Sequence, residues 1–127
     1  MTTTWNFEDT IIVGAGPIGL ACAISARRCG GDPLVVDAGA IVDSIVRYPI
    51  GMTFFTTPEL LEIGGHPFVA SGQKPTREEA LKYYRGVVRA ESLRVRTYTR
   101  LVNAARVDGR IRCTFSTPRG EASADCA

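Results

Sequence analysis

Three glycines, Gly14, Gly16 and Gly19, constrain the fold of this 127-residue chain more than any other feature. The first of them ends Thr10–Gly14, an apolar, β-branched run that is typical of a buried strand. The other two lie at the start of a segment rich in Ala, Ile and Leu, which is typical of a helix. Glycine weakens both strands and helices, so its use here requires a reason. In a dinucleotide-binding turn the three glycines permit the tight turn, the close approach of a pyrophosphate and the close packing of helix on strand.

The residues that follow complete a βαβ unit. The helix is predicted over Pro17–Cys29, and a second buried strand, parallel to the first, over Pro33–Asp37. Asp37 ends that strand, where a carboxylate accepts hydrogen bonds from the ribose hydroxyls of an adenosine. The same charge repels a 2′-phosphate, so the pattern favours FAD or NAD over NADP. The alternative interpretation of the glycines is an ordinary strand-to-helix turn.

The rest of the chain predicts a second helix and an antiparallel layer. Thr76 and Glu79 have the spacing of a capping box that opens a helix, and Asp108-Gly109 is a hairpin signal. We therefore expect an α/β fold: a Rossmann-like parallel sheet with helices and a small antiparallel β layer. The segments predicted after the βαβ unit are a long connection over Ala38–Gln73 and strands over Leu93–Thr99, Arg100–Arg106, Ile111–Ser116 and Glu121–Ala127.

Composition and charge exclude several classes of protein. The longest apolar run is too short to span a bilayer, and the start of the chain is polar and lacks the basic residues of a signal peptide, so we expect a cytoplasmic protein and no membrane partner.

The basic residues are unevenly distributed: twelve of the fifteen Lys and Arg residues fall in residues 74–127. A basic half can attract nucleic acid. However, several of these arginines alternate along predicted strands, as on a solvated face, so we expect no nucleic-acid partner.

The cysteines and the single histidine carry no recognisable chemistry. Cys22, Cys29, Cys113 and Cys126 form no C-x-x-C pair and no zinc spacing, so neither a disulfide framework nor a metal site is expected. We expect Cys22 and Cys29, which share one face of the first helix, to be small buried residues. His66 has no accompanying nucleophile motif, and the sequence therefore predicts no catalytic residue.

Beyond the fingerprint, several motifs resemble one family. Pro17 within the glycine motif resembles the FAD fingerprint of thioredoxin-reductase-like flavoproteins. The long connection and the helix after it resemble the bacillithiol-disulfide reductase branch of those enzymes. The motifs that carry this resemblance are Asp43-Ser44-Ile45, Tyr48-Pro49, Met52-Thr53-Phe54-Phe55, Glu59-Leu60-Leu61, Ile63-Gly64, Pro67-Phe68, Arg77, Ala80, Tyr83-Tyr84-Arg85 and Val88.

The resemblance implies an enzyme of two dinucleotide domains. FAD is held in the first domain and NADPH in the second, and the substrate is the disulfide of a low-molecular-weight thiol. By family position Thr53 is a flavin hydrogen-bond partner and Leu101 or Val102 faces the adenine, although either could be a plain hairpin residue. Tyr48, Phe54 and Phe55 frame the isoalloxazine or anchor the connection. The cofactor-binding candidates are Gly14, Gly16, Pro17, Ile18, Gly19, Asp37, Ala38, Gly39, Thr53 and Leu101.

Two departures from the family qualify that expectation. Ile18 stands where the family often has cysteine, which argues against a thiol-based step there. The chain also stops at Ala127, where the family continues into a further strand. We expect residues 1–127 to be an incomplete FAD-binding domain without the nicotinamide domain and inactive alone, and the full-length protein to be able to form a homo-oligomer. The alternatives are a non-catalytic NAD- or FAD-binding module and an incomplete product that binds nothing tightly.

Overall fold

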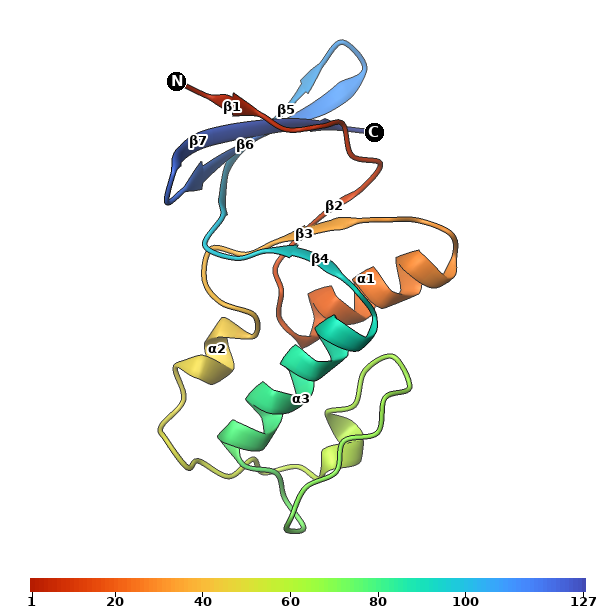
Figure 1. The fold of residues 1–127 in the computed structure, drawn as a ribbon, viewed down its shortest axis with the longest axis vertical. Coiled ribbons are helices and arrows are strands. Elements are labelled where there is room, and N and C mark those ends of the chain that lie inside the picture. The colour runs from red at the N-terminus through yellow and green to blue at the C-terminus, as the bar shows by residue number, and fades with distance from the viewer.

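A parallel sheet of three short strands forms the middle layer of the computed structural model, which describes residues 1–127 (Figure 1). Its order is β2 (Ile11–Val13), β3 (Leu34–Val36) and β4 (Arg94–Arg96), and both pairings are parallel. Helix α1 (Pro17–Arg28) connects β2 to β3. The predicted βαβ unit and third parallel strand are confirmed, with strands that are shorter than the apolar runs suggested.

The expected burial of Cys22 and Cys29 is wrong, because both side chains are exposed. The buried face of α1 consists of Leu20, Ala23 and Ile24. In a helix of about 3.6 residues per turn, a residue two positions after Leu20 points to the opposite side. Cys22 therefore faces solvent, and Cys29 lies at the C-cap beyond the last helical turn.

The long connection contains α2 (Asp43–Val46) and a 3-10 turn (η1, Pro58–Leu60), neither of which was predicted, and it leads into α3 (Arg77–Ala90). The capping box is confirmed: Thr76 Oγ1 accepts from the backbone N–H of Glu79, and the Glu79 carboxylate accepts from the backbone N–H of Thr76. Two tyrosines of α3 then hold the connection, because Tyr83 donates to the carbonyl of His66 and Tyr84 to that of Leu61.

The antiparallel layer is a sheet in the order β1-β7-β6-β5. The predicted hairpin is confirmed, since Asp108 and Gly109 have φ values of 50° and 78°, as a two-residue turn of type I′ requires. Strand β1 was not predicted; it runs parallel to β7, with Thr3 opposite Ala122. The bounds are β1 (Thr3–Thr4), β5 (Arg100–Val107), β6 (Arg110–Thr117) and β7 (Gly120–Cys126).

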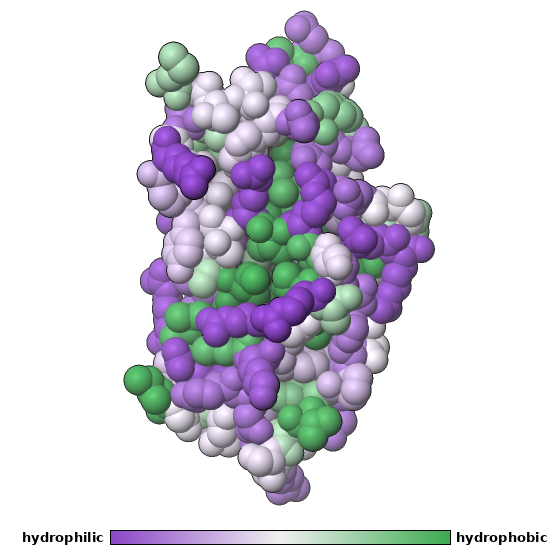
Figure 2. Space-filling model, in the orientation of Figure 1, coloured by the Kyte–Doolittle hydropathy of each residue, from purple (hydrophilic) through white to green (hydrophobic).

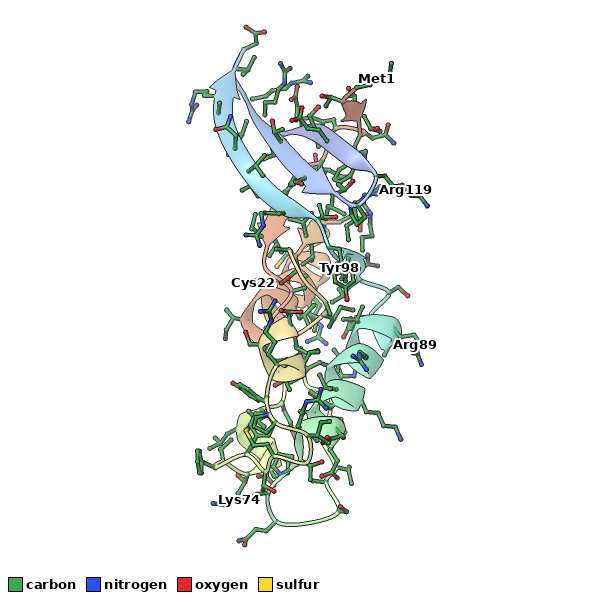
Figure 3. All side chains as sticks on the ribbon, turned by 90° about the vertical axis from the view of Figure 1, so that its left-hand side faces the viewer. Met1, Cys22, Lys74, Arg89, Tyr98 and Arg119 are labelled. Carbon is green, nitrogen blue, oxygen red and sulfur yellow. The ribbon has the colours of Figure 1, made fainter.

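Two apolar cores lie on opposite faces of β3. Val35 belongs to the core beneath α1 and α3, whereas Leu34 and Val36 belong to the core beneath the antiparallel sheet. This alternation follows from the two-residue period of a strand, and burial on both faces is typical of parallel sheets. Phe115 of β6 is fully buried in the second core and stacks on Trp5 with ring centroids 5.1 Å apart. The result is three layers: helices, parallel sheet and antiparallel sheet (Figures 1 and 3).

None of the helices combines the length and apolar character that a bilayer span requires. No group of three or more His, Cys, Asp or Glu side chains is placed to hold a metal ion.

Candidate dinucleotide-binding site

A cavity of about 310 Å³ lies where the carboxyl ends of β2 and β3 meet the start of β5. In open α/β sheets this edge is where ligands bind. On the face shown in Figure 2, apolar surface gathers between the antiparallel sheet and the helices, with polar side chains around it. The residues that line the cavity are Val13, Gly14, Asp37, Ala38, Thr99, Arg100 and Leu101.

Asp37 joins three segments of this site. Its Oδ2 accepts a hydrogen bond of 2.7 Å from the backbone N–H of Ala15, and its Oδ1 accepts one of 2.7 Å from that of Gly39. Each carboxylate oxygen has a second lone pair. Asp37 can therefore hold the glycine-rich turn in place and still accept a hydrogen bond from a ligand hydroxyl.

The peptide of Ala15 is fixed from the other side as well. The backbone N–H of Val42 donates a hydrogen bond of 2.9 Å to the carbonyl of Ala15, whose side chain is fully buried. Val42 makes this contact with φ 47° and ψ 49°. That left-handed conformation is unusual for a β-branched residue. The glycine turn is thus clamped between Asp37 and the loop that begins α2.

Backbone hydrogen bonds extend the β3–β4 pairing and bring Thr99 to the cavity. The N–H of Asp37 donates to the carbonyl of Arg96, and the N–H of Thr99 donates to the carbonyl of Asp37. Tyr98, with φ 51°, donates its N–H to the carbonyl of Gly39. Figure 3 shows Tyr98 at this level of the fold, between the antiparallel sheet and α3. The chain therefore enters β5 directly beside Asp37 and Ala38.

The glycines have the properties that a pyrophosphate site needs. Gly14 has φ +114°, and a Cβ built on Gly14 or Gly16 would meet no atom within 4 Å, so the turn presents bare backbone to open space. A Cβ on Gly19, in contrast, would overlap the carbonyl oxygen of Gly14. Gly16 is the N-cap of α1, no side chain caps this end, and the first turn contains no acidic residue. The N–H groups and positive end of the helix dipole therefore face outward, which fits a phosphate group.

The structure brings most of the predicted site residues together. Four of them line the cavity, and Gly39 binds Asp37. Thr53 does not join them: it is exposed and forms an isolated bridge with Thr76 before α3. The predicted residues in the cavity are Gly14, Asp37, Ala38 and Leu101, and those at the start of α1 are Gly16, Pro17, Ile18 and Gly19.

Three lining residues, Val13, Thr99 and Arg100, were not predicted as site residues. The rule that ligands bind at the carboxyl ends of parallel strands could have indicated Val13, which ends β2. Thr99 and Arg100 lie beyond β4, and no signal in the sequence indicates them. Val102, the alternative to Leu101, does not line the cavity.

The two neighbouring aromatic residues of the long connection, Phe54 and Phe55, differ in burial. Phe54 packs against the core and meets Tyr48 edge-on, with ring centroids 6.0 Å apart, while Phe55 is 95% exposed. Phe54 therefore anchors the connection, and Phe55 is free to contact a ligand or another segment.

His66 lies outside the cavity, in a cluster of charges between α1 and α3. Its Nε2 is 2.7 Å from Oε1 of Glu91, which also accepts from Arg28 at 3.0 Å. The hydrogen bond with His66, followed by the charge of Arg28, lowers the pKa of Glu91. These contacts hold the connection against the helices, and we continue to expect no catalytic role for His66.

A Rossmann-type turn clamped by an acidic residue, beneath an antiparallel layer, is typical of a dinucleotide-binding domain. The chain belongs to the pyridine nucleotide-disulphide oxidoreductase family, which it matches over residues 11–124. It is 46% identical over 85 residues to the bacilliredoxin reductase Bdr of Bacillus subtilis (strain 168), a match that covers 67% of this chain and 26% of that protein.

Two solved structures have the same fold and related sequences. The bacillithiol disulfide reductase Bdr (YpdA) from Bacillus cereus superimposes with a TM-score of 0.91 at 38% identity, covering 96% of this chain and 38% of that one. The corresponding structure from Staphylococcus aureus gives a TM-score of 0.84 at 34% identity, covering 98% and 36%. The chain therefore spans about a quarter to two fifths of the length of these relatives.

Proposed function

We propose that this chain is the FAD-binding part of an NADPH-dependent flavoprotein reductase that acts on the disulfide of a low-molecular-weight thiol such as bacillithiol. The observation that carries the proposal is the cavity at the carboxyl edge of the parallel sheet, where Asp37 lies beside the uncapped start of α1. The names of the related proteins, which are reductases of bacillithiol disulfide or bacilliredoxin, support the substrate class.

In this proposal each part of the site holds a different part of FAD. Asp37 accepts hydrogen bonds from ribose hydroxyls, the N–H groups at the start of α1 bind the pyrophosphate, and the segment Thr99–Leu101 borders the adenine. The protein contributes position and electrostatics, while a bound flavin supplies the redox chemistry. Thr53 stays a predicted flavin contact, by family position alone.

The first test is cofactor choice. We expect purified protein to be yellow or to become yellow with FAD, and a titration followed by flavin fluorescence to saturate. NAD should not compete at similar concentrations. Saturable binding of NAD without binding of FAD would replace the proposal with a non-catalytic NAD-binding module.

The second test is turnover. Residues 1–127 contain one glycine fingerprint, and we propose that the nicotinamide is held elsewhere, in a further domain. Hydride transfer requires the two reacting rings to be held at near-attack distance. Such positioning lowers the activation free energy by several kcal/mol. Residues 1–127 saturated with FAD should therefore oxidise NADPH, with bacillithiol disulfide as acceptor, no faster than free FAD does. A clearly faster rate would place a nicotinamide site within these residues.

A further inference from the structure

Two cavities of about 430 and 420 Å³ lie side by side on α3 and share Lys82 and Gly86. Neither shares a lining residue with the dinucleotide cavity, so the proposed FAD site does not account for them. We refer to both together as the α3 surface, which includes Phe68, Val69, Lys82, Arg85, Gly86 and Arg89.

Gly86 is the first unusual feature of the α3 surface. It lies inside a 14-residue helix that otherwise has a capping box, acidic residues in its first turn and a basic residue in its last. After proline, glycine is the least favourable residue in a helix interior. A Cβ built on Gly86 would meet no atom within 4 Å, and its φ is not left-handed. Nothing inside the chain therefore requires glycine, whereas a segment that lies across the helix would gain close approach to its backbone.

The charges of the α3 surface are the second feature. Lys82, Arg85 and Arg89 take part in none of the ion pairs of the structure. Figure 3 shows Arg89 pointing outward from α3. The nearby carboxylates are already engaged: Glu78 accepts from the N–H of Gly51, and Glu79 accepts from the N–H groups of Thr76 and Ser71. Three cations on one helix face are thus available to carboxylates from outside.

An apolar wall beside Gly86 is the third feature. Phe68 and Tyr83 stack with ring centroids 4.4 Å apart, and the Tyr83 hydroxyl is fixed by its bond to the carbonyl of His66. Val69, next to this pair, is 85% exposed. Phe68 itself is buried in the core, so the exposed part of this wall is Val69 together with the half-buried ring of Tyr83, beside the cations.

We propose that the α3 surface binds an acidic, partly apolar peptide segment of a partner protein, which crosses the helix at Gly86. The apolar side chains of the segment lie against Val69 and the exposed part of the Tyr83 ring, and its carboxylates face Lys82, Arg85 and Arg89. A nucleic acid fits less well, because the surface has an apolar wall and contains the carboxylates Glu78 and Glu79 among its cations. This inference does not depend on the proposed FAD site.

The experiment selects a library of random 12-residue peptides, displayed on phage, on the full chain supplied with FAD. We expect enriched peptides to be acidic with at least one aromatic or aliphatic residue. The enriched peptides are then labelled and titrated by fluorescence anisotropy. Gly86→Leu should weaken binding by about tenfold or more, as obstruction at the centre of an interface does, and Lys82→Glu should weaken it as well. Ser25→Leu, which adds the same side chain to an exposed site on α1, should leave binding unchanged.

Folding is monitored in parallel, because Gly86→Leu replaces glycine by a strong helix former and should raise the melting temperature. Loss of binding together with a higher melting temperature supports the proposal. Failure to enrich acidic peptides, or equal binding to the Gly86→Leu protein, overturns it. Self-association of the wild-type chain that Gly86→Leu abolishes would also overturn it, because the surface would then bind a second copy.

Discussion

The Asp37 carboxylate accepts a hydrogen bond of 2.7 Å from the backbone N–H of Ala15, which lies 22 residues earlier in the chain. The other oxygen of the same carboxylate holds the N–H of Gly39 at 2.7 Å. One side chain therefore fixes the glycine-rich turn to the end of β3. The acidic residue of the fingerprint thus shapes the site in which we propose that it binds a ligand.

Asp37→Asn should weaken FAD binding by about 1–2 kcal/mol, roughly five- to thirtyfold in dissociation constant. Asparagine has one acceptor oxygen, so its amide NH₂ must face one of the two N–H donors, and the charge that strengthens both bonds is lost. Flavin fluorescence titration measures the effect. Asp108→Asn makes the same chemical change in the hairpin turn, where asparagine is favoured, and should leave affinity unchanged. Equal affinities for all three proteins would contradict the role of Asp37.

Two glycine-to-alanine substitutions in helices should have opposite effects on stability. Gly19→Ala places a Cβ against the carbonyl of Gly14, and overpacking of this kind costs about 1–3 kcal/mol. Gly86→Ala meets no atom within 4 Å and should stabilise the chain by about 0.5–1 kcal/mol. Urea unfolding of both variants and the wild type compares them directly. A stable Gly19→Ala protein would show that α1 and β2 are not packed as described.

Stability should fall in acid through Glu79. Its bonds from the backbone N–H groups of Thr76 and Ser71 lower the pKa of this carboxyl from its ordinary value of 4.5 in the folded chain. A group with a lowered pKa in the folded state stabilises it above the unfolded value, and that contribution is lost as pH falls through the folded value. Urea unfolding between pH 7 and pH 3 should show a smaller decline for Glu79→Gln, which keeps an acceptor but does not titrate. Parallel pH profiles for the two proteins would exclude this contribution.

Thiol labelling should separate the four cysteines into two pairs. Cys22 and Cys29 are exposed, whereas Cys113 and Cys126 are buried. Burial and the neighbouring Cys126 raise the pKa of the Cys113 thiol to about 11, so roughly one molecule in a thousand carries its thiolate at pH 8. A chromogenic disulfide should therefore react rapidly with two thiols in the folded chain and with four after denaturation. A Cys22→Ser/Cys29→Ser variant that still reacts rapidly would show that the second core is open.

Local signals explain what could be predicted from the sequence. The βαβ unit, the Thr76–Glu79 capping box and the Asp108-Gly109 turn all depend on residues a few positions apart, and all are present. The positions of Gly14 and Asp37 at one cavity follow from the rule for carboxyl ends of parallel strands, whereas Leu101 was expected there by family resemblance alone.

The features that were missed depend on contacts between distant segments. Strand β1 is two residues long and exists only because β7 lies beside it, so no periodicity could reveal it. Thr99 reaches the cavity through backbone bonds to Asp37 that no side-chain pattern encodes. Cys22 was misplaced because the spacing of two cysteines shows that they share a face but does not show which face packs on the sheet.

The pairing of β1 with β7 also affects how the chain is made. Thr3 and Thr4 find their partners in Ala122 and Ser123, at the other end of the described chain. During synthesis the N-terminal residues emerge first, yet their strand has no neighbour until β7 has left the ribosome. Non-local pairings of this kind slow folding and leave strand edges exposed to other chains in the meantime. The helices and the parallel sheet can assemble earlier, so translation should pass through an intermediate whose antiparallel layer is still open.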